Sequence, residues 1–192
     1  MPEPIVIATW QFGRTAVAVA GELLKKGSPA LDAAIAGAQA VEDDPKVDSV
    51  GFGGIGNAIG TVSLDACVMD GRTLACGAVA ALENVRHAAA VARRVMEKTP
   101  HVLLVGEGAK TFALQQGFPL ETLLTPESAA SWEKRRPKPH KPAAPTGNSD
   151  NHDTVTVLAL DDKGRLGGVC TTSGLAHKMP GRVGDSPIIC SG

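Results

Sequence analysis

The sequence predicts a mixed α/β domain in which helices pack against a sheet of short strands. Its 192 residues include four Phe, two Trp and no Tyr, so aliphatic side chains and alanine must supply the core. That composition suits helices packed on a sheet. Short β-branched runs also alternate with segments rich in Ala and Leu along the whole chain, without an internal repeat. A chain of this length corresponds to about one domain and is long enough to bury a core.

Local patterns predict the individual elements. β-branched or apolar runs indicate strands, and segments rich in Ala and Leu indicate helices. Ser28 and Thr125 are expected to cap helices, each followed by a Pro suited to a first turn, and Asp70-Gly71 predicts the turn of a hairpin. The expected strands are Ile5–Thr9, Thr61–Met69, Thr73–Val79, Val102–Val105, Thr154–Leu160 and Gly167–Ser173, and the expected helices are Ala16–Lys26, Pro29–Ala40, Asn84–Lys98, Ala109–Gln116 and Pro126–Glu133. The strands Ile5–Thr9 and Val102–Val105 are expected to be buried.

A change of composition divides the chain. Residues 134–151 contain four Pro, six basic residues and almost nothing apolar. Such a segment cannot bury enough surface to offset the entropy of ordering it, which predicts a mobile linker within one domain over residues 1–192. The basic run also fits a nucleic-acid-binding tail, but no aromatic residue lies within it to stack on bases, which favours the linker.

Charge and spacing argue against several classes of function. The net charge of −1 gives no reason to expect nucleic acid or an acidic membrane as a partner, and no apolar run approaches the length of a membrane span. The first four residues lack the features of a signal peptide, so a soluble protein, cytoplasmic by default, is expected. The four Cys and five His show no zinc-ligand spacing, and we expect neither a metal nor another cofactor.

Residues 51–56 match the GxGxxG spacing of dinucleotide-binding loops. That motif requires a preceding strand and a helix that begins within it. Here an acidic, proline-containing segment precedes the glycines and a predicted hairpin follows them. A dinucleotide site is therefore not expected.

The junction between the linker and the next strand carries candidate chemistry at Thr154. An uncut Thr154 would be an ordinary strand residue. If the chain is cut before it, the new α-amine has a reference pKa of about 8 and is partly neutral near pH 7. That amine can act as a general base toward the hydroxyl of the same residue. The β-branch limits χ1 and helps to hold Oγ1 in place.

Eight short motifs occur along the chain in a recognisable order. The most specific are NHDT at residues 151–154, CTTSG at 170–174 and GRVGDSPI at 181–188. The others are TWQF at 9–12, ALDA at 30–33, SVGFGG at 49–54, LDA at 64–66 and LVGEG at 104–108. Together they resemble the glycosylasparaginase (aspartylglucosaminidase) family of N-terminal-nucleophile (Ntn) hydrolases, which lies within the wider group of asparaginases and isoaspartyl peptidases. Thr-Trp near the start resembles the glycosylasparaginase branch, because isoaspartyl peptidases typically carry a His-Gly-Gly-Ala-Gly loop there.

The resemblance implies an αββα sandwich, made as a precursor that cuts itself between Asp153 and Thr154. The Thr154 hydroxyl would attack the Asp153 carbonyl, assisted by Asp153 and His152, and water would then release two chains. Residues 1–153 would form the α-chain and residues 154–192 the start of the β-chain. The mature Thr154 would then attack the side-chain amide of N4-(β-N-acetylglucosaminyl)-L-asparagine and release aspartate.

The resemblance also implies a substrate site. Arg182 would bind the substrate α-carboxylate through its planar fork, and Asp185 would pair with the α-ammonium. Thr172 would orient the nucleophile, Trp10 would wall the pocket, and Ser49 would contact the α-amine of the nucleophile. The alternative interpretations are an ordinary surface pair for Arg182 and Asp185, and a core aromatic for Trp10.

The chain departs from the family pattern in two places. Thr156 stands where Gly is usual, and its side chain is expected to crowd the scissile turn. The family continues past the GDSP motif into a Thr-Gly-x-Gly segment that supplies the oxyanion hole, so a fragment or truncated form is expected. Three functions stay open: the glycosyl-asparagine hydrolase, an asparaginase or isoaspartyl peptidase acting on β-aspartyl substrates, and a non-catalytic remnant. A homodimer of processed αβ units is the implied assembly.

Overall fold

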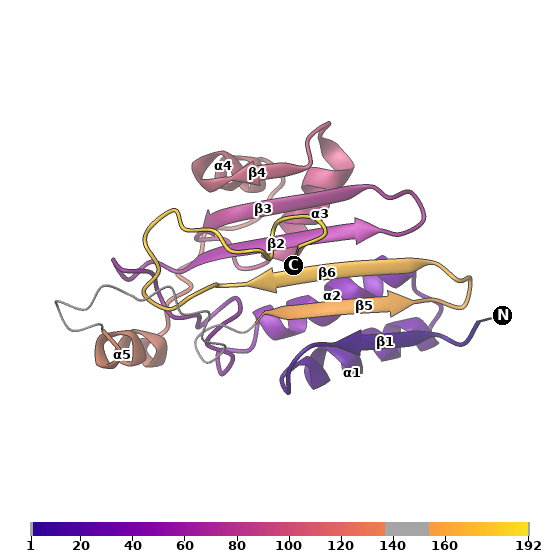
Figure 1. Cartoon of the computed structure of the whole chain (residues 1–192), viewed down its shortest axis with the longest axis horizontal. Helices are drawn as coiled ribbons and strands as arrows, with labels where there is room; N and C mark the ends of the chain where they lie inside the picture. Colours follow the sequence, from indigo (N-terminus) through magenta and orange to yellow (C-terminus); the bar gives the residue numbers. More distant parts are fainter. Residues whose placement is uncertain (1, 137–153, 192) are drawn as a thin grey trace.

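The computed structural model describes residues 2–136 and 154–191, which form a six-stranded sheet with helices on one face (Figure 1). The strands are β1 (Ile5–Ala8), β2 (Ser63–Asp70), β3 (Cys76–Glu83), β4 (Leu103–Val105), β5 (Val155–Leu160) and β6 (Leu166–Thr172). Their spatial order is β1-β5-β6-β2-β3-β4, and neighbours are antiparallel except for the parallel pair β3 and β4. The helices are α1 (Gly13–Lys25), α2 (Ala30–Glu42), α3 (Ala88–Lys98), α4 (Gly106–Gln115) and α5 (Pro126–Lys134).

The helices leave one face of the sheet without a helical cover. Helices α1 and α2 pack on each other and against β1, β5 and β6, while α3 packs on β2 and β3. Residues that follow β6 cross the opposite face in the region of β2 (Figure 1). We call this opposite side the open face. The two faces therefore differ: one holds the helical core, and the other carries the C-terminal part of the chain.

Alternation along the strands separates the core from the open face. In β5 the side chains of Val155, Val157 and Ala159 are buried on the helical side, whereas Leu158, between the last two, is 46% exposed. This is the period of two expected for a strand. Helices α1 and α2 approach closely because Gly37 has no side chain; a Cβ at that position would lie 2.7 Å from the carbonyl oxygen of Ala16.

The start of α2 differs from the prediction. Ser28 does not cap the helix and Pro29 is not its first residue, because Pro29 has extended backbone and itself occupies the N-cap position. The first free amide, on Ala30, donates instead to the buried carboxylate of Asp161 at 3.2 Å. Asp161 also accepts from Nε of Arg165 at 2.6 Å. The cap therefore comes from the β5–β6 turn, far away in the sequence.

Most other elements are confirmed with shifted ends. The Thr125 cap is confirmed, since its hydroxyl accepts from the amide of Ser128 at 3.1 Å. The helix expected from Asn84 begins only at Ala88, because Asn84 has left-handed backbone (φ 62°) that interrupts a helix. Lys134, predicted to start the linker, is the last residue of α5.

Two strands expected to be buried are edge strands. Ile7 of β1 is 59% exposed, and Leu103 of β4 is also exposed. Short apolar runs do not reveal whether a strand lies in the middle or at the edge of its sheet. Residues 137–151 of the predicted linker lie outside the described residues. Within the described ranges, none of the helices is long and apolar enough to cross a membrane.

Candidate active site

Thr154 lies directly before β5 and contacts two other parts of the chain. Its Oγ1 lies 3.2 Å from Oγ of the buried Ser186. Its carbonyl oxygen accepts a hydrogen bond of 2.7 Å from the hydroxyl of Thr9, which in turn accepts from the amide of Thr156 at 2.9 Å. Both the side chain and the backbone of the candidate nucleophile are therefore held by tertiary contacts.

Thr172 is the last residue of β6 and lies at the end of the sheet where β5 begins. The register of β5 and β6, continued by one residue, places Thr154 beside Thr172. The Thr172 hydroxyl donates to the carbonyl oxygen of Ser49 at 3.2 Å and accepts from the amide of Gly174 at 2.9 Å. These bonds give the buried hydroxyl a fixed position next to the candidate nucleophile.

Ser49 contributes to this region through its backbone. Its carbonyl oxygen accepts from both the Thr172 hydroxyl and the Ser173 amide, the latter at 2.7 Å. Ser49 also lines a cavity of about 340 Å³, together with Gln11 and Phe12, which directly follow Trp10 in the sequence. The contact of Ser49 with the α-amine of Thr154 stays a prediction.

Trp10 is not a core aromatic. Its side chain is 54% exposed and it follows Thr9 directly. Its backbone is left-handed, with φ of 62°. That conformation is unfavourable for a residue with a Cβ, and strain of this kind concentrates at functional sites. An exposed, strained Trp next to the residue that holds Thr154 is consistent with a pocket wall.

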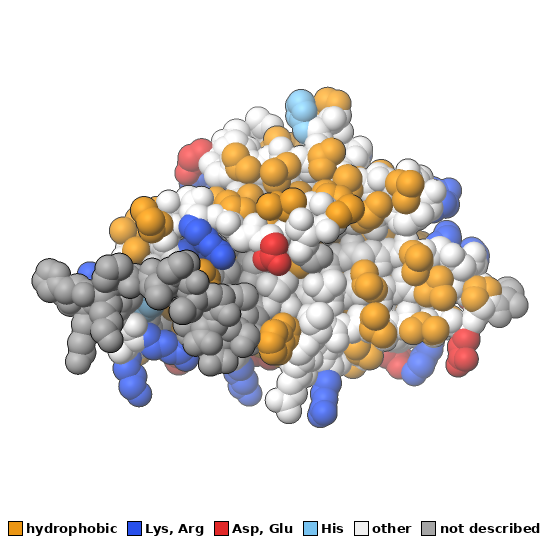
Figure 2. Space-filling view, viewed as in Figure 1, with side chains coloured by type: hydrophobic (Ala, Val, Ile, Leu, Met, Phe, Trp, Pro, Cys, Tyr) orange, Lys and Arg blue, Asp and Glu red, His pale blue; other side chains and the backbone are white. Residues whose placement is uncertain are grey.

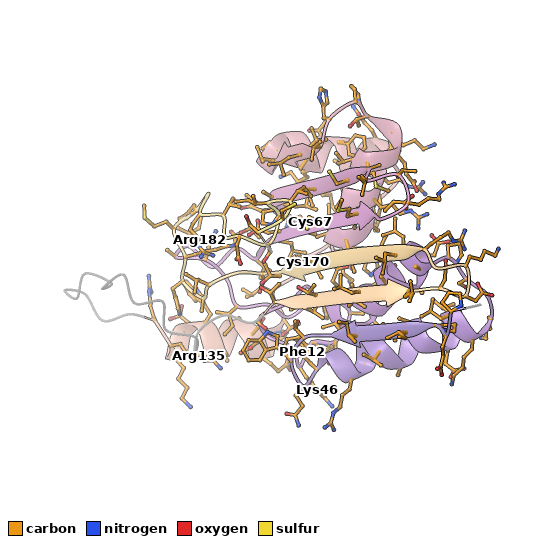
Figure 3. All side chains as sticks on the ribbon, turned by 45° about the vertical axis from the view of Figure 1, so that its right-hand side comes forward. Phe12, Lys46, Cys67, Arg135, Cys170 and Arg182 are labelled. Atoms are coloured by element: carbon orange, nitrogen blue, oxygen red, sulfur yellow. The ribbon has the colours of Figure 1, made fainter. Side chains whose placement is uncertain are left out.

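Arg182 lies in the loop after β6 (Figure 3), and Asp185 follows three residues later in the same loop. The guanidinium of Arg182 lies over the loop glycines: Nη1 is 3.3 Å from where a Cβ on Gly174 would lie and 3.1 Å from the same point on Gly184. Asp185 is exposed and immediately precedes Ser186, the contact of Thr154. Both residues are described and no ion pair joins them, so they do not form a surface pair with each other, and their roles in substrate binding stay a prediction.

Two buried charges next to Arg182 were missed by the sequence analysis. Asp65 of β2 pairs in register with Thr172 and is fully buried. Lys178 is only 6% exposed, and its Nζ lies 3.9 Å from Oδ2 of Asp65. Burial raises the pKa of Asp65 and lowers the pKa of Lys178, and the charge of each opposes the shift of the other. An Asp inside the apolar strand at residues 64–68 was the available signal.

A third buried group lies behind the same end of the sheet, on the helical face. Oε1 of Glu42, the last residue of α2, accepts from the Thr171 hydroxyl at 2.7 Å and from the Ala89 amide at 3.0 Å. Burial raises the pKa of Glu42 to about 8, although both hydrogen bonds favour the ionised form. The carboxyl is therefore mostly protonated at pH 7. It connects α2 to the residue before Thr172 and to the start of α3.

Cys67 and Cys170 face each other on β2 and β6, as Figure 3 shows. All four cysteines are free. A hydrogen bond from the Cys67 thiol lowers the pKa of Cys170 to about 7 against the effect of burial, and the hydroxyls of Thr156 and Ser186 contribute. The same contact raises the pKa of Cys67. Thr156 thus directs its hydroxyl to Cys170 on the open face.

Some predicted features lie beyond what the structure describes. His152 and Asp153 fall outside the described residues. Among the described residues, no group of three or more His, Cys, Asp or Glu side chains is arranged to hold a metal ion. Thr9, Ser186 and Gly174 belong to the quoted motifs, but their contacts depend on tertiary structure.

Residues 5–192 match the protein family described as Asparaginase, and the chain belongs to that family. The six-stranded sheet with its helices is consistent with the Ntn-hydrolase fold of this family, and the predicted α/β class is confirmed. The resemblance to glycosylasparaginase is confirmed as well, by relatives of that name.

Three relatives illustrate the similarity. The N(4)-(β-N-acetylglucosaminyl)-L-asparaginase of Elizabethkingia miricola is 52% identical, over 99% of this chain and 55% of the relative. The isoaspartyl peptidase/L-asparaginase of Rattus norvegicus is 41% identical, over 88% of this chain and 51% of the relative. The N(4)-(β-N-acetylglucosaminyl)-L-asparaginase of Rattus norvegicus is 36% identical, over 97% of this chain and 62% of the relative. The chain thus spans between half and two thirds of the length of these relatives.

Proposed function

We propose that this chain carries the nucleophile of an autoprocessing amidohydrolase, and that Thr154 becomes reactive once the bond to Asp153 is cut. The observation that supports this most directly is the fixation of Thr154, with its Oγ1 at Ser186 and its carbonyl at Thr9. In this proposal residues 1–153 are the α-chain. The β-chain begins at Thr154, within the same domain.

The proposed cleavage is an N-to-O acyl shift followed by hydrolysis. Oγ1 of Thr154 attacks the carbonyl carbon of Asp153, the C–N bond breaks, and the nitrogen becomes the free α-amine. Water then hydrolyses the new ester between the Asp153 acyl group and Oγ1. His152 and Asp153 assist the proton transfers, and Thr154 is left with an internal general base.

The proposed substrate is N4-(β-N-acetylglucosaminyl)-L-asparagine. The α-amine of Thr154 takes the hydroxyl proton, and Oγ1 attacks the side-chain amide carbonyl. The amine leaves with a proton, and water converts the acyl-enzyme to aspartate. Arg182 binds the α-carboxylate, Asp185 binds the α-ammonium, and Thr172, Ser49 and Trp10 complete the site. The identity to the bacterial glycosylasparaginase supports this choice.

A second candidate is an asparaginase or isoaspartyl peptidase. The rat relative with that name, 41% identical, supports it. Both reactions use the same nucleophile and differ in the leaving group. Hydrolysis of the glycosyl-asparagine, of β-aspartyl dipeptides and of asparagine, measured side by side, separates them. Activity on the dipeptides alone would overturn our preference.

Intact mass under denaturing conditions tests the nucleophile. Wild type is expected to give two fragments that meet between Asp153 and Thr154, whereas Thr154→Ala is expected to stay whole. Cleavage at this bond in both proteins would show a protease contaminant. A single unbroken mass in both would contradict autoprocessing and favour the non-catalytic remnant.

We also propose that the chain works as an assembly, a homodimer of processed αβ units. Apolar side chains gather on the open face over β1, β5 and β6, as Figure 2 shows, including Ile7, Leu158 and Leu166, all exposed. Exposed apolar patches of this kind mark interaction surfaces. Light scattering that found a stable monomer would contradict this proposal.

A further inference from the structure

We infer that Lys178 is a positioning residue for substrate recognition: it neutralises the buried Asp65 and so leaves the charge of Arg182 available to the substrate carboxylate. This inference rests on the proposed function, because it concerns the site assigned there to the α-carboxylate. Lys178 and Asp65 are not expected to touch the substrate themselves.

Lys178 is built into the protein interior. Its Nζ donates to the carbonyl oxygen of Ser63 at 3.2 Å and lies 3.9 Å from Oδ2 of Asp65. Its backbone carbonyl accepts from the amide of Ala58 at 2.8 Å. A buried ammonium group is unfavourable unless it has a compensating charge, and Asp65 supplies that charge.

Asp65 is an incompletely satisfied acid at the edge of the site. Its Oδ1 accepts from the amide of Ala81 at 2.8 Å, and the backbone amide of Gly184 gives the carboxylate a weaker hydrogen bond, which leaves Oδ2 without a well-aligned donor among the described residues. Lys178 and Arg182 both act on it electrostatically. The carboxylate is therefore available to whichever cation comes closest.

Gly174 brings the two cations together. A Cβ on this residue would lie 2.9 Å from Nζ of Lys178 and 3.3 Å from Nη1 of Arg182. Two positive charges thus flank one glycine, with one buried negative charge beside them. Lys178, Arg182 and Asp65 together carry a net charge of +1, and Glu83 adds a further negative charge on the Lys178 side, so Arg182 is the cation that remains for a carboxylate ligand.

The balance of charge among Lys178, Arg182 and Asp65 explains how Lys178 acts on Arg182. With Lys178 present, Asp65 has a nearby cation and Arg182 need not compensate it. Without Lys178, the remaining cation at the group is Arg182, and its guanidinium is expected to turn toward Oδ2 of Asp65. Such a contact would take the planar fork away from the substrate side of the loop.

Binding of L-aspartate, the proposed product, tests this inference by calorimetry. Lys178→Met is expected to weaken binding about tenfold or more, because Arg182 becomes neutralised internally. Adding Asp65→Asn in the same chain is expected to restore binding to within about threefold of wild type, because the competing charge is gone. Lys163→Met, the same change on an exposed residue, controls for net charge and should leave binding unchanged.

Modification of Arg182 by phenylglyoxal, followed by peptide mass analysis, gives a readout without any ligand. Arg182 is expected to react in wild type, to be protected in Lys178→Met, and to react again in the double variant. The double variant removes both charges of the buried pair together, so that neither is left uncompensated in the interior. It therefore keeps the test decisive even if Lys178→Met unfolds.

Aspartate binding and Arg182 reactivity together distinguish failure of this inference from failure of the proposed function. Weak binding in both the single and the double variant, with wild-type binding intact, would show a merely structural role for Lys178 and overturn the inference. Unchanged binding and unchanged Arg182 reactivity in Lys178→Met would overturn it too. The expected reactivity pattern without aspartate binding by wild type would support the positioning role and contradict the proposed function.

Discussion

The hydroxyl of Thr9 donates a hydrogen bond of 2.7 Å to the carbonyl oxygen of Thr154. The same hydroxyl accepts from the amide of Thr156, and the Thr9 amide donates to the Thr156 carbonyl at 3.1 Å. The residue after β1 thus fixes the backbone on both sides of Val155. A nucleophile must be held within a fraction of an ångström to react efficiently, so this contact is a functional one in our proposal.

Replacing Thr9 tests that role. Thr9→Val removes both side-chain hydrogen bonds at an exposed site where water can replace them, so stability should fall by less than about 1 kcal/mol. The rate of cleavage before Thr154, measured by intact mass over time, is expected to fall by about tenfold or more. Thr9→Ser keeps the hydroxyl and should process normally. Equal rates in all three proteins would rule out a role for Thr9 in positioning.

Glu42 predicts a pH-dependent stability. Its pKa is raised from an ordinary 4.5 to about 8 in the folded protein. Between these values the folded state holds a proton that the unfolded chain has released, so stability falls as the pH rises through this window. The effect amounts to at most about 5 kcal/mol. Glu42→Gln cannot ionise and should remove this slope.

Urea unfolding at several pH values between 5 and 8.5 measures the effect. The free energy of unfolding of wild type should decrease toward high pH relative to Glu42→Gln. Glu3→Gln, which changes an exposed carboxyl, should follow wild type. Parallel curves for wild type and Glu42→Gln would show that the buried carboxyl is already ionised.

A side chain at Gly174 is expected to destabilise the folded protein. Its φ is +72°, and a Cβ would lie 2.9 Å from Nζ of Lys178. Gly174→Ala should therefore lower stability by about 1 to 3 kcal/mol and weaken aspartate binding. Gly108→Ala is the matched control, because Gly108 lies in α4 with nothing within 4 Å of the added Cβ, and Ala there should stabilise the helix slightly. Similar thermal unfolding of both variants would contradict this prediction.

The thiol of Cys170 should titrate near neutral pH. Its pKa is lowered to about 7, mainly by the hydrogen bond from Cys67. Because Cys170 is only 2% exposed, its ionisation is followed without a reagent, as the difference in ultraviolet thiolate absorbance between wild type and Cys170→Ser over a series of pH values, and this difference should show a midpoint near that value. In Cys67→Ala the donor is gone and the midpoint should move to higher pH. A midpoint that does not move would show that Cys67 is not the donor.

Sequence patterns located most of the elements because they depend on local properties. The capping of α5 by Thr125 and the alternation in β5 follow from residues that lie close together in the chain. The cap of α2 was assigned wrongly for the opposite reason: its acceptor, Asp161, is 131 residues away. Local residue preference predicted Ser28 as the cap, whereas in the folded chain the Ala30 amide is bound by Asp161.

The sequence by itself determined the family, the interleaving of helices and strands, and the position of Thr154 next to the first residue of a strand. These follow from motif order and from the period of apolar residues. Only the tertiary structure decided which groups surround that position, since Thr9, Ser186 and Thr172 come from three distant segments. It also revealed Asp65, Lys178 and Glu42 as buried ionisable groups. Burial and charge pairing are properties of the packed chain, because the free energy of an ionisable group depends on what surrounds it.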